Sequence, residues 1–184
     1  MAFDGTKPAN NSAALTADLR ANLQDLDERL KSLGEVTATV GNVGTGEDIL
    51  ASHTLPAAKL AALGDRVKGI FWGKYVNNAN AKTLRVRVIE GANNTVLLAV
   101  TLTVSEAGHW LLGFVAMRTG ATTFRGAAQV VGGPGNGITT RSSANVTSSS
   151  TATWANAVEL RITGEATGND DITVEGGFFA YGGA

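Results

Sequence analysis

The 184-residue sequence has no cysteine, so neither disulfide bonds nor thiolate metal sites can stabilise its fold. It has no run near the ~18 consecutive apolar residues that a membrane-spanning helix needs. It also lacks an excess of charge of one sign, because 15 basic and 16 acidic side chains leave a formal net charge of −1. No strong field would concentrate nucleic acid or an anionic membrane, and we expect neither as a partner.

The first residues lack the basic start and apolar segment of a secretion signal, and we expect a protein made without export by that route. Residues able to carry chemistry are equally sparse. The two histidines, His53 and His109, stand in no spacing typical of a metal pair or a catalytic triad. Asp170 and Asp171 lack the alternating acidic pattern of a calcium loop. We therefore predict a protein that is not an enzyme and needs no cofactor or metal.

The residues that are abundant favour β structure. Only 17% of the side chains are charged, whereas 23 residues are glycine and Ala, Thr, Val, Asn and Ser are frequent. Strand-like segments recur at regular intervals, separated by turn residues such as Gly-Asp and Asn-Asn. They cover residues 48–55, 66–76, 82–90, 95–104, 109–119, 123–131, 157–166 and 171–181. We predict that residues 47–184 form an eight-stranded antiparallel jelly-roll β-sandwich.

Alternation along these segments predicts which faces are buried. In "KTLRVRVIE" three aliphatic side chains alternate with Arg85 and Arg87, which is typical of a strand with one face in water. By contrast, "FWGKYV", "HWLLGFVAM" and "EGGFFAYGG" are apolar on both sides. Their second faces would have to be covered by a helix, a neighbouring subunit or another protein.

Glycines within the strands leave room for the close approach of large rings. Core packing is the favoured interpretation of these rings, and the alternative is a ligand platform. The candidates for surface binding in that alternative are Trp72, Trp110, Trp154 and Tyr181. The polar stretch 132–154 is predicted to be a long loop, either a binding tip or a mobile connection.

The segment 15–34 has a different pattern, with leucines separated alternately by four and three residues. This is the seam of a coiled coil, and its members are Leu19, Leu23, Leu26, Leu30 and Leu33. We predict a short helix that ends at Gly34 and associates with its own copies. The alternative is that it packs on the β domain of the same chain. Leucine at both seam positions does not fix the number of copies, and residues 35–46 are expected to be a linker or an edge strand.

Four blocks of the chain carry a resemblance to a known family. The opening "MAFDGTKPANNSAALTADLRANLQDLDERL" resembles the N-terminal segment of small structural proteins of tailed bacteriophages. Three later blocks are similar to a jelly-roll domain that recurs in phage appendages: "HTLPAAKLAALGDRVKGIFWGKYVNNANAKTLRVRV", "HWLLGFVAMRTGAT" and "ELRITGEATGNDDITVEGGFFAY". The resemblance implies a virion protein of the head-fibre, decoration or short tail-fibre type, with a trimerising helix before a distal β domain.

The same resemblance implies the partners. Residues 1–14 would form a polar anchor on other virion proteins, with Phe3, Lys7 and Pro8 as the anchoring candidates. The chain would form a homotrimer, and a host-surface glycan is a further candidate partner. The sequence does not decide between the head and the tail of the particle.

Two other functional classes compete with this interpretation. A carbohydrate-binding β-sandwich module would use outward-facing aromatic rings. A polysaccharide-degrading enzyme would need a pair of carboxylates, and no spacing selects two among Glu90, Glu106, Glu159, Glu165 and Glu175. We regard the enzyme as the less favoured of the two.

The predicted seam can be tested directly. Replacing both Leu26 and Leu30 with Asp places charges in the apolar interface and is expected to convert the oligomer into a monomer. Sedimentation velocity measures the change, and an unaltered oligomer would reject the seam.

Overall fold

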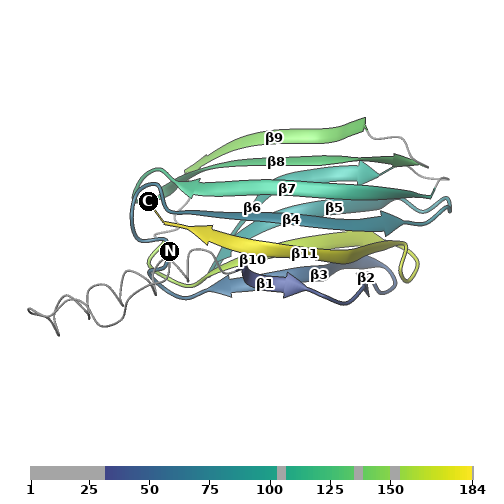
Figure 1. Cartoon of the computed structure of the whole chain (residues 1–184), viewed down its shortest axis with the longest axis horizontal. Helices are drawn as coiled ribbons and strands as arrows, with labels where there is room; N and C mark the ends of the chain where they lie inside the picture. The colour runs from purple at the N-terminus through teal and green to yellow at the C-terminus, as the bar shows by residue number, and fades with distance from the viewer. Residues whose placement is uncertain (1–31, 103–106, 135–138, 150–153, 184) are drawn as a thin grey trace, which may run out of the picture. The chain divides into compact units, whose positions relative to one another are not determined.

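The chain forms a sandwich of two antiparallel β-sheets (Figure 1), as a computed structural model shows. The structure describes residues 32–102, 107–134, 139–149 and 154–183. Within these residues lie eleven strands. No helix able to cross a membrane occurs in this part of the chain.

Sheet A has the strand order β1-β11-β4-β7-β8-β9, and the short strand β2 also pairs with β11. Its strands are β1 (Ser32–Val36), β2 (Val40–Gly41), β4 (Arg66–Tyr75), β7 (Gly108–Arg118), β8 (Thr123–Pro134), β9 (Thr139–Ser149) and β11 (Ile172–Gly182). Sheet B has the order β3-β10-β5-β6. Its strands are β3 (Gly46–Leu55), β5 (Lys82–Glu90), β6 (Asn93–Leu102) and β10 (Val158–Ala166).

All eight predicted strands are present, as β3 to β8, β10 and β11, and the two-sheet sandwich is confirmed. The jelly-roll topology and the strand number were wrong. A jelly roll has eight strands in two Greek keys, whereas here β1, β2 and β9 bring the total to eleven among the described residues. In addition, β5 and β6 form a hairpin within sheet B, and β7 and β8 form one within sheet A.

The predicted long loop 132–154 is also corrected. Strand β8 continues to Pro134, and residues 139–149 form β9, which pairs with β8 from Thr139 to Ser149. This segment has little apolar alternation, so its sequence gave no strand signal. The backbone hydrogen bonds offered by the edge of β8 do not depend on such alternation.

The predicted helix does not extend to Gly34, because residues 32–36 form β1 along β11. Leu33 packs partly buried against the core of its own sandwich and is therefore not available to a helical seam. Leu19, Leu23, Leu26 and Leu30 lie outside the described residues.

The core lies between the inner faces of the two sheets. In β5 the predicted alternation is confirmed, since Leu84, Val86 and Val88 are buried and the two arginines between them are not. Sheet A contributes aromatic rings, and the centroids of Phe71 and Phe179 lie 4.6 Å apart. Such ring pairs contribute about 0.5–1.5 kcal/mol beyond the burial of their area.

The aromatic core needs strand positions without side chains. At Gly73 of β4, an added Cβ atom would come within 2.6 Å of Cζ2 of Trp110 and would overlap the carbonyl oxygen of Thr173. At Gly113 of β7, an added Cβ would meet no atom within 4 Å. The two glycines therefore have different roles: the first makes room for the core, and the second opens the surface.

This difference gives a matched pair of variants. Gly73→Ala forces the Trp110 ring or the backbone to move and is expected to lower the free energy of unfolding by about 2 kcal/mol or more. Gly113→Ala adds the same methyl group in open space and is expected to change it by less than about 1 kcal/mol. Urea denaturation of both variants checks this, and equal effects would contradict the assigned packing.

Candidate functional site

The titratable side chains of the described residues form no metal-binding group. None of their His, Asp and Glu side chains form a group of three or more that could hold a metal ion. His53 is partly buried with its ring 6.1 Å from that of Phe179, and burial lowers its pKa. His109 is exposed on β7. The candidate sites are therefore polar clusters and surfaces.

A polar cluster at one end of the sandwich is explained by its own hydrogen bonds. The buried Asp171 carboxylate accepts hydrogen bonds from the side-chain amides of Asn78 and Asn80 and from the backbone N–H of Gly168. Burial opposes its charge, but these hydrogen bonds prevail and lower its pKa. The fully buried Lys82 ammonium donates to Oδ1 of Asn78 at 2.7 Å and to the carbonyl of Asn80 at 2.8 Å. These hydrogen bonds join the turn of Asn78 and Asn80 to the turn of Gly168 and Asp171.

The outer face of sheet B carries several paired charges, together with the exposed side chains of Ile49 and Val96. Glu47 accepts two hydrogen bonds from the Arg87 guanidinium, at 2.5 and 2.6 Å, and one from the Thr163 hydroxyl. Arg85 pairs with Glu165 at 2.6 Å. The hydrogen bond from Arg87 is the main reason that the pKa of Glu47 is lowered. These groups satisfy one another, so this face does not favour a charged partner.

The outer face of sheet A has a different chemistry. Cross-strand register places fourteen residues of its three central strands on this face. They are Arg66, Lys68, Ile70, Trp72 and Lys74 of β4, His109, Leu111, Gly113, Val115 and Met117 of β7, and Arg125, Ala127, Gln129 and Val131 of β8. Five of these form what we call the apolar strip: Ile70, Trp72, Leu111, Val115 and Val131.

The apolar strip is open to solvent. Ile70, Trp72 and Leu111 are 44%, 47% and 44% exposed. They lie side by side, because Trp72 is directly opposite Leu111 in the β4–β7 ladder. Clusters of large exposed apolar side chains on a sheet face mark sites of interaction.

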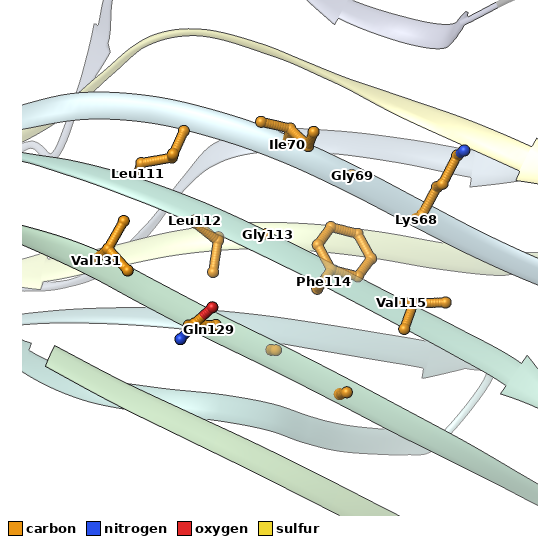
Figure 2. A pocket seen from close by; sticks show the side chains of 12 residues that line it. Lys68, Gly69, Ile70, Leu111, Leu112, Gly113, Phe114, Val115, Gln129 and Val131 are labelled. Atoms are coloured by element: carbon orange, nitrogen blue, oxygen red, sulfur yellow. The ribbon is translucent and has the colours of Figure 1, made fainter. Parts of the chain in front are cut away.

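A depression of about 630 Å³ opens within this face. Figure 2 shows Gly113 near its centre, with Ile70 of β4 on one side and Gln129 of β8 on the other. The missing side chain at Gly113 creates the hollow, because its row partners on both neighbouring strands carry side chains. Lys68 stands at one end of the depression and Leu111 towards the other.

The position of Trp72 depends on another glycine. An added Cβ on Gly176 of β11 would come within 2.6 Å of Cε2 of Trp72, so the indole occupies the space above that glycine. The ring is supported by the neighbouring strand and yet remains about half exposed. An aromatic side chain held in this way offers a preorganised contact surface.

Cations gather beyond the apolar strip. Arg66 and Arg125 share one row across β4, β7 and β8, and Lys68 lies in the next row. We call these three exposed residues the basic end. Among the described residues, no carboxylate forms an ion pair with any of them. Lys74, at the opposite end of β4, pairs with Glu175 at 3.0 Å.

The structure separates the four residues predicted for surface binding. Trp72 is exposed as that alternative requires, whereas Trp110 and Trp154 are only 2% and 3% exposed and cannot contact a partner. The Trp154 ring packs edge-on against Phe124 at 5.2 Å. Tyr181 is partly buried and donates a hydrogen bond to Asp65 at 3.0 Å.

Other predicted sites lie outside the described residues. These are the anchoring candidates Phe3, Lys7 and Pro8 and four of the five seam leucines, Leu19, Leu23, Leu26 and Leu30.

The sequence matches no protein-family model and no curated protein sequence. Two solved structures are similar to it at a distance. One is the CBM2 module of the evolved Dit of Lactobacillus casei BL23 phage J-1, with 9% identity and a TM-score of 0.34 over 81% of this chain and 94% of that one. The other is a protein of unknown function from Shewanella oneidensis MR-1, with 10% identity and a TM-score of 0.36 over 95% and 96%. At these scores the likeness does not indicate what this chain binds.

The basic end and Gln129 were not among the predicted site residues. A signal for part of the site was present in "RVKGIFWGKY", where every second residue from Arg66 to Lys74 shares the face of Trp72. The same periodicity places Trp110 in phase with Leu112 and Phe114, and the structure buries all three. The site residues of β8 could be found only once the strand order was known, and the sequence did not reveal that order.

The charges on sheet B give a prediction for pH. Because pairing lowers the pKa of folded Glu47, its stabilising contribution is complete above the ordinary value of 4.5 and is lost as pH falls through the lower folded value. We expect Glu47→Gln to reduce the free energy of unfolding by roughly 1 kcal/mol at pH 7. The deficit should shrink below pH 4.5. Urea denaturation at several pH values measures it, and a constant deficit would contradict the pairing.

Proposed function

We propose that this chain is a non-enzymatic structural protein of a bacteriophage virion. It is an oligomeric surface appendage, a homotrimer of the head-fibre, decoration or short tail-fibre type. Each copy presents the outer face of sheet A to the host surface. Neither nucleic acid nor membrane is among its partners.

The observation that carries this proposal is the contrast between the two outer faces. On sheet B, Glu47 and Arg87 bind each other, and their neighbours are paired in the same way. On sheet A, Trp72 and Leu111 lie exposed beside a depression. The first arrangement is complete within one chain, whereas the second gains from a partner that removes the apolar area from water, at about 25 cal/mol per Å².

The sequence supports the oligomeric and virion parts of the proposal. The leucine spacing from Leu19 to Leu30 favours association of copies, and the opening segment resembles those of phage structural proteins. Residues 1–14 would attach to other virion proteins. Several copies of a weak contact face would then bind a repetitive host surface with high avidity.

A second candidate function, a carbohydrate-binding module that works without a virion, is favoured by the supported and exposed ring of Trp72. The two proposals differ in location and in oligomeric state. Mass spectrometry and immunogold electron microscopy of particles of the encoding phage distinguish them. If the chain is absent from the purified particles, the proposal that it is a virion protein is wrong.

The contact face itself is tested by competition. The purified chain should slow adsorption of the phage to its host, and Trp72→Ser with Leu111→Ser should abolish this competition because the apolar strip loses two of its three large exposed side chains. Ile49→Ser on β3 of sheet B is the matched control, since Ile49 is 45% exposed against 44% for Leu111. Equal competition by all variants would refute the assignment of this face.

A further inference from the structure

We propose that the outer face of sheet A binds an acidic polysaccharide. The apolar strip receives the sugar rings, and the basic end receives their carboxylates. This inference rests on the proposed adhesive function and adds the chemical class of the ligand.

The charge on this face selects an anion. Arg66, Lys68 and Arg125 are exposed cations without an ion-pair partner among the described residues. Glu175 of β11 pairs with Lys74 at the other end of β4, and Glu35 lies on the edge strand β1, which β11 separates from β4. A carboxylate held by Arg or Lys forms charge-assisted hydrogen bonds about twice as strong as neutral ones.

The same charges argue against a second copy of this face as the occupant. Two copies packed face to face through the depression would bury six unpaired cations, three from each copy, close to a shared interface. Covering a cation in an interface without an anionic partner is unfavourable, because the charge loses its hydration. An anionic partner removes that cost and also covers the apolar strip.

The dimensions fit an extended chain of sugars. Trp72 and Arg66 are six residues apart on β4, which corresponds to roughly 20 Å at about 3.4 Å per strand residue. The depression with Gly113 at its centre lies between them. Aromatic stacking, hydrogen bonds and ion pairs are thus available on one face: the indole of Trp72, the amide of Gln129 and the cations of the basic end.

A polysaccharide fits this face better than an acidic peptide. An extended peptide gains affinity by adding a strand to a free sheet edge, where its backbone groups find partners. Strand β4 is hydrogen-bonded to β11 and β7, and β7 is hydrogen-bonded to β4 and β8, so this face has no such edge. Sugar hydroxyls are small and rotate freely, so they can form hydrogen bonds with side chains and with water and need no sheet edge.

Binding is tested with the full chain and two hexasaccharides that contain uronic acids. One is hexagalacturonate, and the other alternates glucuronate with N-acetylglucosamine. At least one should bind, with an affinity that falls as salt is added. The methyl ester of the hexasaccharide that binds should have an affinity lower by about tenfold or more, because esterification removes the carboxylate charge. Because Trp110 and Trp154 are buried, the binding-induced change in tryptophan fluorescence should come from Trp72 and should disappear in Trp72→Phe.

Matched charge variants locate the site. Arg66→Gln with Arg125→Gln should weaken binding of the acidic hexasaccharide about tenfold or more and should reduce its salt dependence. Arg161→Gln with Arg87→Gln removes the same charge from the outer face of sheet B and should leave the affinity unchanged. Urea denaturation of each variant confirms that it is folded.

Three results would overturn the inference: no binding of either hexasaccharide, equal binding of acid and ester, or equal binding of hexaglutamate. If these occur while Trp72→Ser with Leu111→Ser still abolishes competition for adsorption, the adhesive function stands and only the ligand class fails. If competition also persists in that variant, the contact face itself is wrong.

Discussion

The structure depends on the packing of large aromatic rings against strand backbone that has no side chain. On the inner face of sheet A, Trp110 occupies the space beside Gly73, and on the outer face Trp72 occupies the space above Gly176. The first contact brings a bulky ring into the core without separating the strands. The second holds a ring at the surface. The same kind of contact thus serves both stability and the candidate site. At these positions the favourable packing of the ring outweighs the entropic cost of placing glycine in a strand.

Polar groups that bind one another distinguish two other parts of the described structure from the outer face of sheet A. The buried Asp171 and Lys82 are each surrounded by hydrogen-bond partners from neighbouring turns, as buried charges must be. On the outer face of sheet B, Glu47 and Arg87 are paired in the same sense. The outer face of sheet A is distinct because it combines exposed apolar side chains with cations that have no such partners.

Much of the fold follows from local pattern. Eight strands were predicted within a few residues of their observed ends, because turn residues interrupt each apolar segment. The buried side of β5 followed from strict alternation around Arg85 and Arg87. Strand β9 was missed because its Ser- and Thr-rich segment has no apolar alternation, and pairing with β8 supplies the hydrogen bonds instead. Leu33 continued the leucine spacing but joined β1, because pairing with β11 and burial against the core override helical pattern.

The sequence by itself determined the β class and the strands that are apolar on both sides, because composition and two-residue periodicity are local properties. It could not assign the tryptophans. Only the tertiary structure placed Trp110 in the core and left Trp72 in solvent, since each depends on which sheet face lies against the other sheet. The site also required the order β4-β7-β8, which brings Arg66 and Arg125, 59 residues apart in the chain, into one row on either side of Met117. Strand order is decided by the packing of the whole sandwich, and no short stretch of sequence encodes it.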